Sequence, residues 1–399
     1  MKPKHLLFPL TLSLLVACQP KADVGTEIPV ANLRELISNP SMLSLNEEIK
    51  QVEYIPLRTT EDDQSLIDGV AGFAVTSKHI YVYPVKEQRI VLFSRQGEFI
   101  RTLITFGQGP GEFNDMLSDI QANEERNRLY LFGFSGIWEY TLEGEYLQKY
   151  EYKQQAIFQR LLTVDRLGAV AFPYMPFKNG SFGLGIFTLQ GDTIAIKNNF
   201  YASGVAPEKA GFTIRSAASY TPIDNSILFK MGANDTVFRI TDKTIEPACV
   251  LQLNNSDKEV RMSIDATDFG SMQDSGSSSD IIISEMMETP SYYYFRLRYD
   301  EGHFVMALHK NIGKAMVEKC IQPADLTTLS DANLLSGMLG TRSYQNFPIW
   351  GRMESGCLAQ IITPYELSLY KETNKITIPE ALQGVGEDDN PIVILYHLK

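Results

Sequence analysis

Short apolar runs, each bounded by Gly, Asn, Asp or Pro, follow one another from about Ile49 to the end of the chain. Examples are residues 79–85 (HIYVYPV), 128–134 (RLYLFGF) and 303–309 (HFVMALH). Runs of this length that are rich in β-branched and aromatic residues predict strands. Because no helical segments separate them, the pattern argues against a parallel α/β sheet and predicts an all-β protein.

The connections between paired runs repeat one pattern. Residues 94–99 (SRQGEF), 141–146 (TLEGEY) and 188–193 (TLQGDT) each place a glycine in a tight turn between two strands. About five such units are visible, and a sixth lies around residues 346–367. Small strand-only units in series can bury their faces against their neighbours, which favours a β-propeller over a sandwich or a barrel. Counting alone would also allow seven or eight units.

We therefore predict a six-bladed β-propeller made of four-stranded antiparallel blades. The strands at residues 49–57 and 391–398 are expected to share one blade and so close the ring, which leaves no free edge. Residues 263–290 depart from the pattern because they are rich in Ser and Asp and then briefly helical. This segment is interpreted as an insertion between the fourth and fifth units.

The N-terminus has the pattern of an exported lipoprotein. Two lysines precede an apolar run that is too short to span a bilayer, and the run ends in Leu15-Val16-Ala17-Cys18. This ending resembles the bacterial lipobox, in which the cysteine is acylated. The predicted divisions are a signal peptide at 1–17, a tether at 18–47 with a helical turn near residues 32–37, and the propeller at 48–399. Acyl chains such as palmitate on Cys18 would hold the domain on a membrane.

Several elements together resemble a known family. The lipobox, residues 53–60 (EYIPLRTT), the G-x-G-P-G-E-F element at 107–113 and the ending at 387–399 (EDDNPIVILYHLK) are similar to six-bladed propeller lipoproteins of Gram-negative bacteria. These proteins are related to the NHL and TolB-like propellers. The resemblance implies a propeller anchored to the outer membrane, facing the periplasm or the outside. The function of that family is largely undefined.

The net charge and the spacing of the cysteines and histidines limit which ligands and metals the protein is expected to bind. The net charge is −12, and removal of residues 1–17 with their two lysines leaves −14, which does not suit nucleic acid. The remaining cysteines, Cys249, Cys320 and Cys357, have no C-x-x-C spacing, so they are expected to be buried thiols or to include one disulfide. The histidines show no metal-binding spacing either. No metal and no cofactor are predicted.

The sequence contains no catalytic motif that identifies an enzyme class. No G-x-S-x-G is present, since residues 133–136 (GFSG) lack its spacing. Propellers instead bind ligands in a funnel at one end. The candidate funnel residues are Gln108, Glu112, Arg160, Arg215, Arg298, Trp350 and Arg352. The predicted function is a monomeric, envelope-anchored binding module for a carbohydrate, a peptide or a surface protein. The alternatives are a glycan lyase or hydrolase that uses funnel carboxylates, and a structural scaffold.

Residues 106–113 (FGQGPGEF) allow two interpretations, because a glycine-rich loop can either hold a ligand or shape a turn. No phosphate-loop Lys-Ser/Thr follows, which excludes a nucleotide cradle. We interpret the stretch as the connector between the first and second blades, anchored by a phenylalanine at each end. Gln108 and Glu112 are the two residues of the loop left to contact a ligand.

Overall fold

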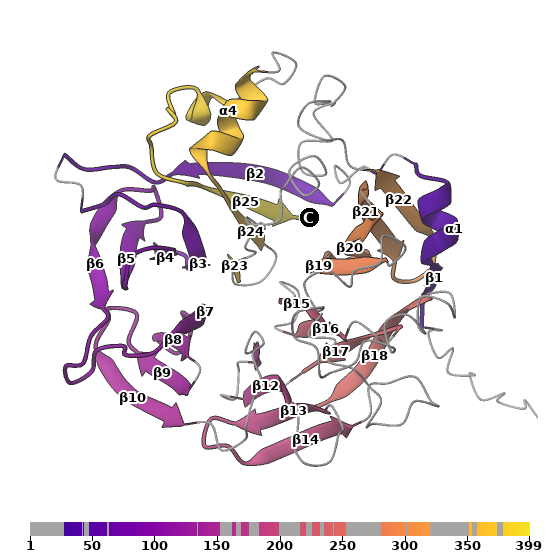
Figure 1. Ribbon diagram of the computed structural model, residues 1–399, viewed down its shortest axis with the longest axis horizontal. Coiled ribbons are helices and arrows are strands. Elements are labelled where there is room, and N and C mark those ends of the chain that lie inside the picture. Colours follow the sequence, from indigo (N-terminus) through magenta and orange to yellow (C-terminus); the bar gives the residue numbers. More distant parts are fainter. Residues whose placement is uncertain are drawn as a thin grey trace, which may run out of the picture.

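The structure is a computed structural model. It describes residues 28–41, 43, 48–61, 64–133, 135–151, 162–164, 169–174, 183–198, 216–220, 226–231, 235–241, 243–252, 281–300, 302–319, 351–352, 357–372 and 378–399. Small sheets stand side by side around a central axis and form a β-propeller (Figure 1). No helix in these ranges is long and apolar enough to cross a membrane.

Each sheet is built mainly from consecutive strands. The first contains β3 (Val70–Val75), β4 (His79–Pro84), β5 (Arg89–Ser94) and β6 (Phe99–Thr105). The next contains β7 (Leu117–Asn123), β8 (Arg128–Gly133), β9 (Gly136–Tyr140) and β10 (Tyr146–Glu151). The third contains β11 (Leu162–Val164), β12 (Ala169–Tyr174), β13 (Gly183–Thr188) and β14 (Thr193–Asn198).

The remaining sheets follow the same order with two additions. One contains β15 (Ser216–Tyr220), β16 (Ile227–Met231), β17 (Thr236–Ile240), β18 (Ile245–Gln252) and the N-terminal β1 (Val30–Asn32). Another contains β19 (Ile282–Glu288), β20 (Tyr292–Tyr299), β21 (Gly302–His309) and β22 (Ala315–Lys319). The last contains β23 (Gly351–Arg352), β24 (Cys357–Ile362), β25 (Ile392–Leu398) and β2 (Ile49–Pro56). The helices are α1 (Leu33–Ser38), α4 (Pro364–Glu372) and the 3₁₀ turn η4 (Glu380–Leu382).

The predicted blade composition needs correction. Five of the sheets, not six, are four-stranded and antiparallel. The sheet β15–β18 carries β1 as a fifth strand, and β1 pairs with β18 in parallel. This pairing could not be predicted, because three residues in a polar segment carry too little hydrophobic pattern to indicate a strand.

The closing pair of strands is as predicted. β2 pairs antiparallel with β25, from Ile49 opposite Leu398 to Pro56 opposite Ile392. The N-terminal part of the propeller thus supplies the outer strand of the sheet that the C-terminus completes. The core consists of apolar clusters between neighbouring sheets, with one cluster joining β2, β24 and β25 to β3, β4 and β5.

One predicted helix is a strand. The segment Ile282–Glu288 lies in the region interpreted as an insertion with a brief helix, but it forms β19. β19 pairs with β20 along its length and contacts β15 of the neighbouring sheet. A short apolar run cannot be assigned to helix or strand by its period alone, and here the pairing with β20 decides.

The three repeated glycine turns share one structure, as predicted. Ser94, Thr141 and Thr188 each stand before the turn, and each side-chain oxygen accepts a backbone N–H from within it. The glycine of each turn has a positive φ, between 84° and 88°. Gly97 also approaches the neighbouring sheet, because Arg58 N–H donates to its carbonyl at 2.8 Å.

Replacing Gly97 by alanine is expected to lower the free energy of unfolding by about 2–4 kcal/mol. An added Cβ would lie 2.2 Å from the carbonyl oxygen of Pro56 in β2, on a backbone with φ of +85°. The matched control is Gly313→Ala, since Gly313 has φ of +64° but no heavy atom within 4 Å of the added Cβ. The control should lose only about 1 kcal/mol, and equal losses in urea denaturation would contradict the close packing of Gly97.

Candidate functional site

The FGQGPGEF stretch lies where it was predicted, between β6 and β7. β6 is the outer strand of one sheet and β7 the inner strand of the next. The rings of Phe106 and Phe113 lie 4.7 Å apart between centroids, and their backbones form an isolated bridge. Phe106 stacks on Tyr83 of β4 at 5.6 Å, whereas Phe113 contacts Trp138 of β9 at 4.6 Å. Each phenylalanine therefore anchors the loop to a different sheet, as predicted.

Glu112 turns back into its own loop. Its Oε2 accepts the backbone N–H of Gly109 at 2.8 Å, and its backbone N–H donates to the Gly109 carbonyl at 3.1 Å. An added Cβ at Gly107 would lie 2.0 Å from the same carboxylate, so a larger residue would displace it. The loop thus uses Glu112 to hold its own path. Of the two ligand candidates in the stretch, Gln108 is exposed to solvent.

Side chains of the sheet β7–β10 contact the FGQGPGEF loop. The hydroxyl of Tyr140 donates to the carbonyl of Gly111 at 3.1 Å. Gly111 has φ of +79°, and an added Cβ there would meet Tyr146 at 2.9 Å. Asp115 then links the connector to the turn between β8 and β9, because its Oδ2 accepts both the N–H and the hydroxyl of Ser135, at 2.7 and 2.8 Å.

The other predicted funnel residues are only partly visible. Arg298 lies near the end of β20 and is half-buried. Arg352 lies in β23, but its side chain is outside the described part of the structure. Arg160, Arg215 and Trp350 lie outside the described residues, as does the predicted lipidation site Cys18. The structure therefore does not bring these candidates together as a described site.

The two ends of the ring differ in the length of their connections. At the end that carries FGQGPGEF, the described part of the chain includes the link 106–116 between β6 and β7, most of the link between β2 and β3 (57–61 and 64–69), and α4 and η4 between β24 and β25. At the opposite end, the turns in the described part of the chain are short, as at 76–78, 95–98 and 124–127. Long connections on a rigid scaffold are where binding residues concentrate.

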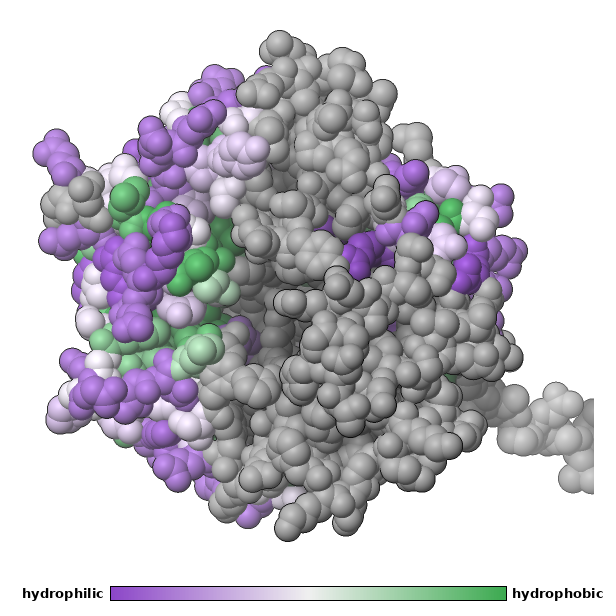
Figure 2. Space-filling view, in the orientation of Figure 1, coloured by the Kyte–Doolittle hydropathy of each residue, from purple (hydrophilic) through white to green (hydrophobic). Residues whose placement is uncertain are grey.

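The described surface is mixed in polarity. Figure 2 shows apolar residues over the sheets β3–β6 and β7–β10, with hydrophilic residues around them toward the rim. Three exposed apolar side chains belong to connections at the FGQGPGEF end: Leu66 at 42%, Val85 at 57% and Met116 at 68% exposure. An ion pair between Lys86 and Asp68 lies beside them in sequence. Neither charge nor aromatic character dominates this part of the end.

A buried carboxylate inside the sheet β7–β10 is a candidate acid that sequence reasoning did not find. Glu139 is 6% exposed. Its Oε1 accepts from Arg128 Nε at 2.9 Å and from the Tyr130 hydroxyl at 3.3 Å. Its Oε2 accepts from Gln148 Nε2 and the Tyr150 hydroxyl, both at 2.8 Å. Four donors satisfy this carboxylate, so it joins the strands rather than facing a substrate.

These contacts shift the pKa values of Glu139 and Tyr150. Burial alone would raise the pKa of Glu139, but the hydrogen bonds from Gln148 and Tyr150 and the charge of Arg128 outweigh it and lower the pKa. Burial and the carboxylate together raise the pKa of Tyr150 to about 12. Both groups therefore keep their neutral-pH charge states, with Glu139 ionised and Tyr150 protonated.

The lowered pKa of Glu139 predicts an acid-dependent loss of stability. The unfolded chain, with a pKa near 4.5, takes up the proton first, so the contribution is complete above that pH and is lost as pH falls through the folded value. We expect the urea midpoint of the Glu139→Gln variant to fall less than that of the unchanged protein between pH 5 and about pH 3. Glu145→Gln, at an exposed position near the same sheet, is the control and should follow the unchanged protein. Parallel curves for all three proteins would contradict the assignment.

The cysteines are partly accounted for. Cys249 and Cys357 are free and buried, which confirms the prediction of buried thiols at these two positions. Burial raises the pKa of the Cys249 thiol and raises that of Cys357 to about 11. Both are therefore protonated and unreactive at neutral pH. Cys320 lies outside the described residues.

The sequence matches a protein family over most of its length. The profile described as Domain of unknown function (DUF4934) matches residues 28–397. The chain belongs to this family. The match to DUF4934 begins at the first described residue, ahead of β1, and ends within β25. No curated protein matches the chain.

A solved structure shares the fold of this DUF4934 protein. A protein of Bacteroides fragilis, described as a candidate exported protein, has 13% identity and a TM-score of 0.62, with 90% of this chain and 98% of that chain covered. A member of the DUF4221 family from Bacteroides vulgatus has 10% identity and a TM-score of 0.46, over 88% of this chain and 97% of that chain. At these identities the first likeness shows a shared fold and carries no assignment of function.

Proposed function

We propose that the protein is a lipid-anchored, six-bladed propeller whose FGQGPGEF end binds a ligand outside the cytoplasm. The observation that carries the proposal is the difference between the described connections at the two ends, with eleven residues at 106–116 on one and three or four at 76–78, 95–98 and 124–127 on the other. Long surface links on a rigid scaffold commonly carry binding residues, which favours this end as the binding face. Carbohydrate, peptide and surface protein are the ligand classes proposed.

The lipidated Cys18 and the outer membrane location belong to the same proposal. They are supported by the lipobox-like residues 15–18 and fit the exported-protein description of the Bacteroides fragilis structure. The glycan-active alternative receives no support from Glu112, because that carboxylate is hydrogen-bonded within its own loop. Binding is therefore the function that the geometry favours.

Two exposed glutamines provide a matched test. Gln108 lies on the link between β6 and β7, and Gln96 lies on the short turn between β5 and β6. The full chain, purified in detergent, is applied to an immobilised polysaccharide panel and to a peptide array, and envelope extract supplies surface proteins. We expect Gln108→Ala to weaken the captured interaction at least several-fold and Gln96→Ala to leave it unchanged.

Two results would overturn the proposal. One is capture on none of the three probes, and the other is equal weakening by Gln108→Ala and Gln96→Ala. Release of sugar fragments from the polysaccharide panel, measured in the same samples, would instead support the enzyme.

A further inference from the structure

The residues that precede β2 are not a free tether along their whole length. Val30–Asn32 pair with Val250–Gln252 at the edge of β18, and Val250 N–H donates to the Pro29 carbonyl at 2.9 Å. The helix α1 follows at once, with Asn32 as its N-cap, and contacts β22 of the next sheet. We call residues 28–43 the N-terminal arm. It spans the seam between the sheets β15–β18 and β19–β22.

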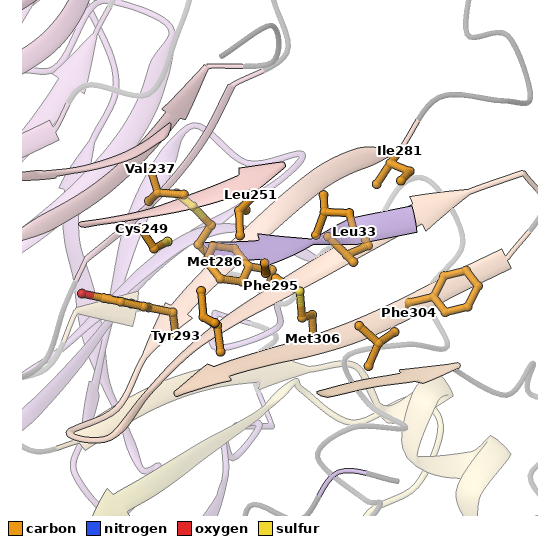
Figure 3. Packing of buried hydrophobic residues seen from close by; sticks show 14 of the residues in the cluster. Leu33, Val237, Cys249, Leu251, Ile281, Met286, Tyr293, Phe295, Phe304 and Met306 are labelled. Atoms are coloured by element: carbon orange, nitrogen blue, oxygen red, sulfur yellow. The ribbon is translucent and has the colours of Figure 1, made fainter. Parts of the chain in front are cut away.

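Burial holds the N-terminal arm in place. Leu33 is fully buried, Ala31 and Leu43 are 3% and 4% exposed, and Ile37 is 8% exposed. Figure 3 shows Leu33 among side chains from both sheets, including Leu251 from β18 and Phe295 and Met306 from β20 and β21. Each such Leu or Ile contributes about 1.5–3 kcal/mol when fully buried. These apolar contacts favour the docked position of the arm.

Polar contacts fix the register of the arm. Arg34 Nη1 donates to the Tyr299 hydroxyl at 3.1 Å, and its guanidinium lies 5.3 Å from the centre of the Tyr299 ring. Leu43 N–H donates to Glu318 Oε2 at 3.1 Å, next to the end of β22. The arm is thus bound at its start, in its helix and at its end. Its first residue, Ile28, is a fixed point on the rim of the ring.

We infer that the docked arm holds one rim of the propeller, formed by β1, α1 and β22, against the lipid bilayer. The inference rests on the proposed acylation of Cys18. Nine residues lie between Cys18 and Ile28, and the ten Cα–Cα steps span at most about 35 Å when extended. A free tether reaching Ile49 would span about 105 Å and would allow any side of the ring to face the membrane.

The consequence concerns the ligand-binding end. The arm leaves the ring at its rim, beside the outer strands β18 and β22, and α1 lies on the outside of the ring in Figure 1. The membrane therefore approaches the rim, and the FGQGPGEF end is not pressed against lipid. The bilayer is the partner of the arm-bearing rim.

A distance measurement tests this orientation. Asn311→Cys lies in the exposed turn that leads into β22, the strand that α1 contacts, and Glu143→Cys lies in the corresponding turn between β9 and β10 of a different sheet. Both are made in the acylated full chain with Cys320→Ser, labelled with a fluorophore and bound to phosphatidylethanolamine–phosphatidylglycerol vesicles that contain headgroup-quencher lipid. We expect at least twofold stronger quenching at position 311 than at position 143.

Two insertions distinguish the effect of the docked arm from that of the lipid anchor. Twenty Gly-Ser residues placed after Thr26 lengthen the path between the lipid and the arm, and should abolish the difference between the two positions. The same insertion after Ser44 lies beyond the arm, and should leave the difference unchanged. Equal effects of the two insertions, or equal quenching in the uninserted chain, would overturn the docked arm as the orienting element.

The failure of the anchor itself gives a different result. If Cys18 is not acylated, the protein does not sediment with vesicles and the quenching at both positions is absent. That outcome refutes the lipid anchor of the proposed function and with it the orientation. Vesicle binding with no positional difference refutes the orientation alone.

Discussion

Replacing Asn390 by alanine is expected to lower the free energy of unfolding by about 3–5 kcal/mol, one of the two largest effects predicted for this chain. Asn390 is fully buried and precedes β25. Its Oδ1 accepts Ile67 N–H at 2.8 Å and its Nδ2 donates to the Ser65 carbonyl at 2.8 Å. Alanine would leave both of these backbone groups buried without a partner.

Because of its position, Asn390 stabilises the closure of the ring. Ser65 and Ile67 belong to the link from β2 to β3, which leads from the closing sheet to the first one. Leu57 N–H also donates to the Pro391 carbonyl, at 3.1 Å, so the two ends of the propeller meet here. The asparagine thus fastens the closing sheet to the sheet β3–β6.

The neighbouring Asp388 provides the control for Asn390. It is exposed, and Asp388→Ala should change the free energy of unfolding by less than about 0.5 kcal/mol. Urea denaturation followed by fluorescence measures both variants, and limited proteolysis between β2 and β3 reports local opening. An Asn390→Ala variant as stable as Asp388→Ala would show that the link from β2 to β3 does not depend on the amide.

Local signals explain why so much of the fold could be predicted from the sequence. The turn at residues 94–99 needs only its own glycine and its own hydroxyl, so its recurrence at 141–146 and 188–193 was visible along the chain. The strands that close the ring were predicted because two long apolar runs stand at the two ends. The FGQGPGEF stretch was placed correctly for the same reason, since it separates two recognisable units.

The features that the sequence did not reveal depend on distant residues. The arm is polar in pattern, and only its docking on Leu251 and Phe295 shows why Leu33 is apolar. Glu112 was a reasonable ligand candidate until its contact with Gly109 placed it inside the loop. Buried polar groups such as Asn390 look like any turn residue in the sequence, because their partners lie more than 300 residues away.

The second large effect is expected at Glu288, where replacement by glutamine should lower the free energy of unfolding by about 3–5 kcal/mol. Glu288 ends β19 and its side chain is 1% exposed. Its Oε1 binds Arg239 of β17 and also Lys310, which follows β21. The carboxylate therefore joins the sheets β15–β18 and β19–β22. A neutral amide would remove the negative charge that both of these partly buried cations contact.

A double-mutant cycle separates the ion pair from the packing around it. Lys310→Met keeps the length of the side chain, whose ammonium lies 5.0 Å from the centre of the Tyr293 ring, and removes the charge. If the pair is what stabilises the seam, Glu288→Gln should cost at least about 1 kcal/mol less in the Lys310→Met background than in the unchanged protein. Strict additivity would contradict the coupling.

An exposed pair calibrates the effect of burial. Arg58 and Glu98 lie 2.9 Å apart with side-chain exposures of 68% and 58%. Because water screens that pair and both side chains stay mobile, Glu98→Gln should cost less than about 1 kcal/mol. The carboxylates of Glu98 and Glu288 each lie within contact distance of a cation, so distance alone would rank them as equals. The difference in stability between the two variants should follow the difference in desolvation, because only Glu288 has lost its water and depends on Arg239 and Lys310 to replace it.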